Sequence, residues 1–260
     1  MPSLDAIFKA YDVRGTVPDQ LDPELAHAIG VGFATFAREE SEGRGESVTR
    51  VLMARDMRPS GVELSAAFAD GVRSQGLDVV DLGLGSTDLL YFASGSLNAP
   101  GAMFTASHNP AQYNGLKFSK NEARPVSGDH GIVLLEKCVK DNDLPASTRP
   151  GTVTTADVAA DYARHVLSFL RRPPGSDTAR RLKVVVDASN GMAVVDKAIW
   201  DALGVDLVPL YFELDGSFPN HEANPLKLEN LRDLQAKVLE VGADLGVSCD
   251  GDFDRAAFID

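Results

Sequence analysis

One pattern occurs twice along this chain of 260 residues. In the first half, the apolar run "TRVLMARD" at 49–56 is followed by a helical pattern and then by a second apolar run at 77–83. In the second half, the same order returns with "LKVVVDASN" at 182–190 and "VDLVPL" at 205–210, again with a helical pattern between them. Short apolar runs alternate with helices where crossover helices join the strands of a parallel sheet. The sequence therefore predicts a diverged internal duplication of an α/β unit.

The predicted fold class is α/β, with two similar three-layer α/β/α domains built on mainly parallel, mixed sheets. The first domain is expected to cover 1–150 and the second 151–260, because the proline-containing stretch 144–155 is typical of a linker. The chain ends on a strand pattern at 256–260, so we expect the second domain to be cut there rather than finished. Helices are expected at 23–40, 59–75, 87–97, 130–140, 156–170, 192–203 and 226–241.

Composition narrows the class of protein. Hydrophobic residues make up 44% and charged residues 24% of the chain, a balance typical of globular proteins. The net charge of −13 argues against nucleic acid as a partner, because nucleic-acid binding depends on Lys and Arg. No apolar run is long enough to cross a membrane, and the N-terminus lacks signal-peptide features. With only Cys138 and Cys249, far apart, a reduced cytoplasmic protein is the expectation.

The stretch "TASHNP" at 105–110 places Ser107 beside His108 in a loop after an expected strand. The Gly-x-Ser-x-Gly elbow of lipase-type hydrolases is absent, since Thr105 and Asn109 occupy the flanking positions. Side chains adjacent in sequence usually point apart, so we do not expect Ser107 and His108 to act as nucleophile and base. Taken alone, Ser107 is an ordinary loop serine.

The residues after this loop favour a functional role for Ser107. Asn114-Gly115 is a strong turn pair, and strand character resumes at 116–118. Lys117 would then be held rigidly enough to act as a base or a phosphate partner, although a surface lysine on an edge strand is common. The stretch 83–88 has one glycine too few for a dinucleotide-binding loop, and is expected to lead into a helix.

A second motif, "DGDFDR", begins at Asp250. Carboxylates at Asp250, Asp252 and Asp254 can converge only in a loop, where Gly251 would let the chain turn. Three close carboxylates repel one another and require a cation or a basic partner, and carboxylate oxygens suit Mg²⁺ or Ca²⁺. The spacing does not match a calcium-binding EF-hand. Arg255 could pair with these acids or with a phosphate group.

The third motif, "KAYDVRG", runs from Lys9 to Gly15 and is weak when taken alone. In their order and spacing, however, the three motifs strongly resemble those of the α-D-phosphohexomutases. The "YDVRG" form resembles the phosphomannomutase/phosphoglucomutase branch more than the phosphoglucosamine mutases. The resemblance covers the whole chain, but only the first two of the four domains found in that family.

The resemblance implies a role for each motif. Ser107 would carry a phosphoryl group, donate it to a hexose phosphate and recover a phosphoryl group from the bisphosphate intermediate. Mg²⁺ would be held by the phosphoserine and the three aspartates of the "DGDFDR" loop, and Lys117 would be the general acid/base. The residues implied to bind phosphate or to line the site are Tyr11, Arg14, His108 and Arg255.

The resemblance also implies what this chain lacks. Sugar recognition and a further phosphate-binding loop belong to the third and fourth domains of the family. The expected partners are therefore a hexose phosphate, a hexose bisphosphate and the missing C-terminal domains, and very low mutase turnover is expected from this chain alone. One alternative is a non-catalytic phosphosugar- or metal-binding module. A phosphatase with an aspartate nucleophile is disfavoured, because such enzymes usually carry Asp-x-Asp near the start of a domain, followed by Thr or Val.

Overall fold

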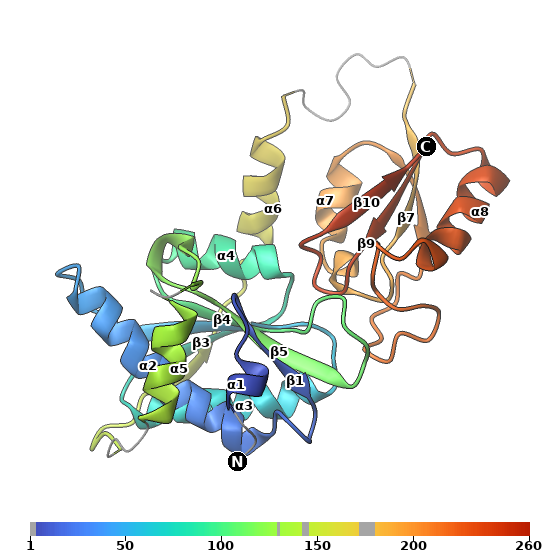
Figure 1. Ribbon diagram of the computed structural model, residues 1–260. Helices are drawn as coiled ribbons and strands as arrows, with labels where there is room; N and C mark the ends of the chain where they lie inside the picture. Colours follow the sequence, from blue (N-terminus) through green and yellow to red (C-terminus); the bar gives the residue numbers. More distant parts are fainter. Residues whose placement is uncertain (1–3, 129–130, 142–145, 172–179) are drawn as a thin grey trace. The chain divides into compact units, whose positions relative to one another are not determined.

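The computed structural model describes residues 4–128, 131–141, 146–171 and 180–260. The chain divides into two compact units, each with its own sheet (Figure 1). The first contains residues up to 84, 90–106 and 112–156, and the second contains 157–260. Two short segments, 85–89 and 107–111, pack with the second unit although they lie in the first half of the sequence.

The first sheet has six strands in the order β1-β5-β4-β2-β3-β6. Strands β4, β2, β3 and β6 run parallel, whereas β5 pairs antiparallel with both β4 and β1. Their bounds are Val13–Thr16 (β1), Arg50–Arg55 (β2), Asp78–Leu84 (β3), Gly101–Phe104 (β4), Tyr113–Ser119 (β5) and Val153–Thr155 (β6).

Apolar residues of helices α2 and α3 form the core of the first unit with the sheet. Phe33 of α2 packs against Phe68 of α3 and Phe118 of β5, with ring centroids 5.9 and 4.9 Å apart respectively. Phe68 also meets Phe104 edge-on. The helices are α1 (Leu4–Ile7), α2 (Pro23–Glu42), α3 (Ser60–Ser74), α4 (Thr87–Ser96) and α5 (Ile132–Lys140), with a 3₁₀ turn, η1, at Asn121–Ala123. Asp22 caps α2 by accepting a hydrogen bond from the Leu25 amide at 2.8 Å.

The second sheet has four strands in the order β10-β9-β7-β8. Strands β9, β7 and β8 are parallel, and β10 pairs antiparallel with β9. One apolar cluster joins the sheet to Trp200 of α7, and another joins it to Leu234 and Val238 of α8. The strands are β7 (Lys183–Asp187), β8 (Asp206–Leu210), β9 (Leu245–Cys249) and β10 (Ala256–Ile259). The helices are α6 (Ala159–Ser168), α7 (Lys197–Ala202) and α8 (Arg232–Val241), with 3₁₀ turns η2 (Met192–Val194) and η3 (Leu228–Leu231).

The predicted fold class is confirmed, and the two sheets share one topology. The order β5-β4-β2-β3 of the first unit matches β10-β9-β7-β8 of the second, with the antiparallel strand at the same position. The "TASHNP" loop connects β4 to β5, and the "DGDFDR" loop connects β9 to β10. The two chemistry-bearing loops therefore occupy equivalent places in the duplicated fold.

Two local predictions were wrong. Strand β6 lies inside the expected linker 144–155 and pairs with β3 in the first sheet. Asn114-Gly115 is not a turn: both residues lie within β5, where Gly115 pairs with Arg14 of β1. A Cβ atom at Gly115 would lie only 2.1 Å from the carbonyl oxygen of Val13, so the glycine allows two strands to approach closely. The sequence also predicts a loose connecting stretch at 172–181, around Pro173-Pro174-Gly175, and most of it lies outside the described residues.

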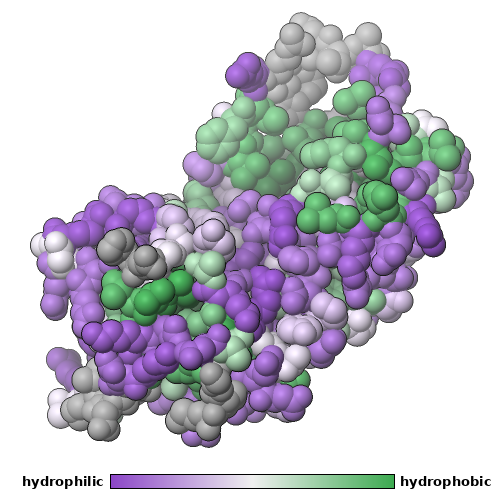
Figure 2. Space-filling model, viewed as in Figure 1, coloured by the Kyte–Doolittle hydropathy of each residue, from purple (hydrophilic) through white to green (hydrophobic). Residues whose placement is uncertain are grey.

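Hydrophobic residues gather over the second unit in the space-filling view, whereas the visible face of the first unit is largely hydrophilic (Figure 2). Exposed large apolar residues of the second unit include Phe169 after α6 and Phe258 on the edge strand β10. Among the described residues, no helix has both the length and the apolar character needed to span a bilayer.

Candidate functional site

Ser107 is fully buried and lies in the left-handed region, with φ 52°. This conformation is uncommon for a residue other than glycine and costs about 1 kcal/mol or more. The Ser107 hydroxyl donates a hydrogen bond to Oδ2 of Asp250 at 2.7 Å, and its Oγ lies 3.4 Å from Nδ1 of His108. The expectation that the two neighbouring side chains point apart was wrong, because these two atoms lie within hydrogen-bonding distance. The hydroxyl proton is nevertheless directed at Asp250.

The three carboxylates of the "DGDFDR" loop converge. Asp250, Asp252 and Asp254 offer oxygen atoms that all lie within 4.8 Å of one another. Asp250 organises the loop, because its Oδ1 accepts the backbone N–H groups of Asp254 and Arg255 at 3.2 and 3.1 Å. The expected turn at Gly251 is confirmed, because the Phe253 amide donates to the Asp250 carbonyl oxygen at 3.2 Å across it. The left-handed residue of the loop is Phe253, with φ 58°.

Arg255 connects the loop to the serine. Its Nε lies 3.1 Å from Asp250 Oδ2 and 3.3 Å from Asp254 Oδ1, and its guanidinium also donates to Ser107 Oγ. Arg255 can therefore compensate part of the negative charge and orient the serine hydroxyl. One guanidinium does not balance three carboxylates.

The negative charge that Arg255 leaves uncompensated contributes to a raised pKa of Asp250. Burial, followed by repulsion from Asp252 and Asp254, raises this pKa to about 7, although the hydrogen bond from Ser107 and the charge of Arg255 oppose the rise. Two of these acids, Asp250 and Asp252, are fully buried, and Asp254 stands at the exposed rim. An all-oxygen donor set with excess negative charge fits a hard divalent cation such as Mg²⁺.

The other predicted site residues belong to the first unit. Tyr11 is 73% exposed and precedes β1. Arg14 lies on β1 and forms an ion pair with Asp12. The register pairs Val13 with Leu116 and Arg14 with Gly115, and successive side chains alternate between the faces of a sheet. Arg14 and Lys117 therefore project from the same face, opposite to the buried Val13 and Leu116.

A contact that the sequence did not indicate also reaches the "DGDFDR" loop. Thr87, the first residue of α4, donates its hydroxyl to Oδ2 of Asp252 at 2.6 Å. No spacing rule links these positions, which lie 165 residues apart. The sequence predicts Thr87 only at the junction of the 83–88 loop with the helix expected at 87–97, with no role in the site.

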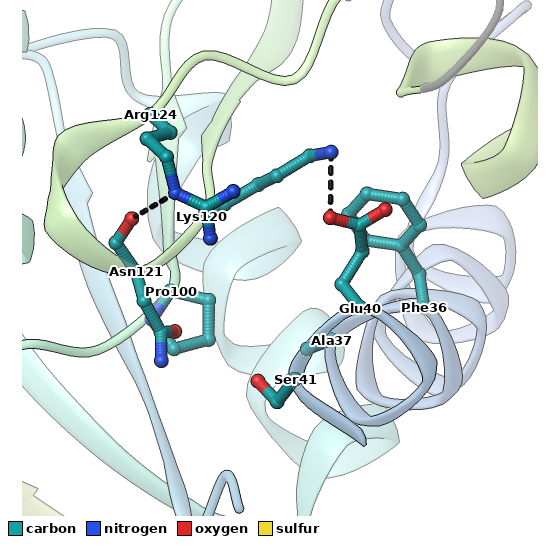
Figure 3. Close-up of a pocket in the computed structure, with 8 residues that line it drawn as sticks. All are labelled: Phe36, Ala37, Glu40, Ser41, Pro100, Lys120, Asn121 and Arg124. Atoms are coloured by element: carbon teal, nitrogen blue, oxygen red, sulfur yellow. Dashed lines mark hydrogen bonds and ion pairs between the residues drawn. The ribbon is translucent and has the colours of Figure 1, made fainter. Parts of the chain in front are cut away.

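A cavity beside α2 in the first unit has no comparable chemistry. Its lining residues come from α2, from Pro100 before β4 and from the segment around η1, and it holds about 10 Å³, enough for one water molecule (Figure 3). Lys120 forms an ion pair with Glu40 at 2.7 Å, and Arg124 donates to the carbonyl of Asn121 (Figure 3). The cavity is too small for a sugar phosphate.

His221 forms a partly buried ion pair with Asp187 at the end of β7. Its Nε2 lies 2.8 Å from Oδ2 of Asp187, and its Nδ1 lies 2.9 Å from the carbonyl oxygen of Glu222. Both partners are acceptors, so both ring nitrogens can donate only in the imidazolium form. Burial lowers the pKa of His221, but the hydrogen bonds to Asp187 and Glu222 outweigh it and raise the pKa above 6.5.

This pair predicts a pH-dependent stability. Because the folded-state pKa of His221 is raised, its stabilisation is complete below about pH 6.5 and is lost as pH rises through the folded-state pKa. His221→Gln keeps a donor for Asp187 but cannot titrate. We expect the variant to unfold about 2 kcal/mol more easily than the parent at pH 5.5, with a smaller difference at pH 9. Urea unfolding across this range measures the difference, and a pH-independent gap would contradict the imidazolium assignment.

Comparisons with known proteins match both halves of the chain to one family. The family described as "Phosphoglucomutase/phosphomannomutase, alpha/beta/alpha domain I" matches residues 5–145, and its domain II matches residues 160–260. A phosphomannomutase/phosphoglucomutase of Pseudomonas syringae pv. tomato is 39% identical over 98% of this chain and 52% of its own length. A Xanthomonas campestris protein named "Phosphohexose mutases" is 40% identical over 97% of this chain and 54% of its own length.

A solved structure of the same family also matches this chain. The crystal structure of a phosphoglucomutase/phosphomannomutase family protein from Burkholderia thailandensis matches with a TM-score of 0.86 and 36% identity, over 100% of this chain and 55% of that one. The chain thus spans about half the length of the relatives that it matches.

Proposed function

Because the chain belongs to the phosphoglucomutase/phosphomannomutase family, we propose that it serves the interconversion of hexose 6-phosphate and hexose 1-phosphate, of mannose, glucose or both, with Ser107 as the phosphoryl carrier. The observation that carries this proposal is the hydrogen bond of 2.7 Å from the Ser107 hydroxyl to Asp250, a member of the converging carboxylates. A serine hydroxyl buried against acids and an arginine suits a phosphoryl acceptor whose phosphorylated form needs cationic partners.

We propose Mg²⁺ as the cation of this site. Asp250, Asp252 and Asp254 would hold it together with the phosphorylated Ser107. When bound, Mg²⁺ supplies positive charge that offsets the carboxylates and the transferring phosphoryl group.

The phosphoryl step then uses this chain's own groups. The Ser107 oxygen forms a bond to phosphorus as the bond from phosphorus to the sugar oxygen breaks, and the sugar oxygen keeps the electron pair. The serine proton leaves along the hydrogen bond to Asp250. Lys117 supplies the proton that the sugar oxygen takes up, as a general acid/base. Arg255 and His108 contact the Ser107 hydroxyl. We assign Arg14 and Tyr11 to contacts with the phosphate groups of the substrate.

Phosphoryl transfer at Ser107 and recognition of the sugar are assigned to different parts of the family's fold. The family resemblance implies that the sugar-binding residues belong to the part of the relatives that this chain does not span. Positioning contributes much of the barrier reduction in phosphoryl transfer. We therefore propose that the isolated chain accepts a phosphoryl group at Ser107 but turns over slowly as a mutase.

A single-turnover experiment tests the function. The chain is mixed with Mg²⁺ and a hexose 1,6-bisphosphate that is radiolabelled in its phosphates. We expect label on the protein and an equal amount of hexose monophosphate. Binding without transfer would instead favour the non-catalytic module, and release of inorganic phosphate would favour the phosphatase.

Lys117→Met is predicted to slow this transfer by about 100-fold, because the departing sugar oxygen then lacks a general acid. The affinity for the bisphosphate should fall much less. Rapid-quench transfer rates and equilibrium binding separate the two effects. Lys120→Met is the matched control, since Lys120 forms an ion pair with Glu40 and is not assigned to the site. An unchanged transfer rate in Lys117→Met would remove Lys117 from the mechanism.

A further inference from the structure

Thr87 holds Asp252 at two points. Its hydroxyl donates to Oδ2 of Asp252 at 2.6 Å, and its backbone N–H donates to the carbonyl oxygen of the same residue at 3.1 Å. Both residues are completely buried. Residues 85–89 pack within the second unit, so this contact lies inside one compact body together with the "DGDFDR" loop.

The start of α4 is built to present this hydroxyl. Ser86 precedes the helix and accepts the amide of Leu89 at 3.3 Å, which satisfies one of the free N–H groups of the first turn. The Thr87 amide is satisfied by Asp252 itself. The partial positive charge at the beginning of a helix also favours a nearby carboxylate in its ionised form.

A hydrogen bond to one oxygen of a carboxylate fixes the rotation of the group and the direction of the other oxygen. Asp250 is already oriented by its own loop and by Ser107. For Asp252, the hydrogen bond from Thr87 comes from a different part of the chain. Partners of this kind set the geometry of metal ligands, and their loss typically lowers metal affinity by about 10- to 100-fold.

We propose that Thr87 is a positioning residue for the metal site, acting through Asp252. This inference rests on the proposed Mg²⁺ site. It predicts that the hydroxyl of Thr87, rather than its shape, supports cation binding. The threonine does not contact the reacting atoms.

Thr87→Val tests the inference, because it removes the hydroxyl while nearly conserving the shape. We expect Mg²⁺ affinity, measured by calorimetry on the whole chain, to fall by about 10-fold or more. Thr87→Ser restores a hydroxyl and should recover most of the affinity. Thr35→Val is the matched control, since the Thr35 hydroxyl donates to the Val31 carbonyl oxygen within α2, in the first unit. Urea unfolding of each variant without metal reports the structural cost separately.

The outcomes are distinct. Weak binding in Thr87→Val, recovered in Thr87→Ser and absent from Thr35→Val, supports the positioning role. Equal affinity in Thr87→Val and the parent overturns it while leaving the metal site intact. Equal losses in Thr87→Val and Thr87→Ser also overturn it, because the hydroxyl is then not the cause. Failure of the parent itself to bind Mg²⁺ contradicts the metal assignment in the proposed function instead.

Discussion

Asp252→Asn is expected to lower the affinity of the chain for Mg²⁺ by at least about 100-fold, because losing a charged ligand costs more than losing a partner of that ligand. The three carboxylates lie within 4.8 Å of one another, and Asp252 is one of the two that are fully buried. The amide can still accept the hydrogen bond from Thr87, so the loop should keep its conformation. Isothermal calorimetry with Mg²⁺ measures the loss.

The same substitution should also change how stability responds to the metal. A ligand that binds only the folded chain raises its unfolding free energy according to concentration and affinity. The parent should therefore gain melting temperature as Mg²⁺ is added, and Asp252→Asn should not. Asp206→Asn is the matched control, since it removes an exposed carboxylate from β8 of the same unit. Unchanged calorimetric binding in Asp252→Asn would rule out the acidic loop as the metal site.

Ser107→Ala is expected to abolish phosphoryl transfer to the protein altogether, since the methyl group offers no oxygen to form the bond. Intact mass after incubation with a hexose 1,6-bisphosphate and Mg²⁺ should show one added phosphoryl group in the parent and none in the variant. Ser65→Ala is the control, because Ser65 is a buried serine that bonds to a helix carbonyl in α3. The buried site should tolerate the change, which also removes a hydrogen bond to Asp250.

A different result would point to a different enzyme class. Phosphate that remains on Ser107→Ala and maps to an aspartate of the "DGDFDR" loop would indicate an aspartyl-phosphate mechanism. Phosphate that maps to another serine would remove Ser107 from its role while leaving a phosphoserine mechanism in place.

The duplicated α/β architecture could be predicted because its signals are local. Apolar runs such as 49–56 and 182–190 and the helices between them each depend on residues close in sequence. The linker prediction failed at β6, where a short exposed strand with little apolar character is held by its pairing with β3. Such pairing depends on a partner distant in sequence.

The site was predictable as a set of residues but not as a geometry. Motif order indicated Ser107 and the three aspartates, yet the left-handed conformations fall at Ser107 and Phe253 rather than at a glycine. Strain of this kind is maintained by surrounding contacts and leaves no mark on composition. The sequence did not indicate Thr87 either, because its hydrogen-bond partner Asp252 lies 165 residues away.

The central claim, that Ser107 carries the phosphoryl group beside a divalent cation, can be tested by one ³¹P NMR experiment. The chain is phosphorylated with a hexose bisphosphate, freed of metal, and titrated with paramagnetic Mn²⁺ in place of Mg²⁺. We predict a phosphoserine resonance, absent from Ser107→Ala, that broadens strongly at substoichiometric Mn²⁺ and much less in Asp252→Asn. A phosphoserine resonance that stays sharp as Mn²⁺ is added, or a signal typical of an acyl phosphate, would contradict the account.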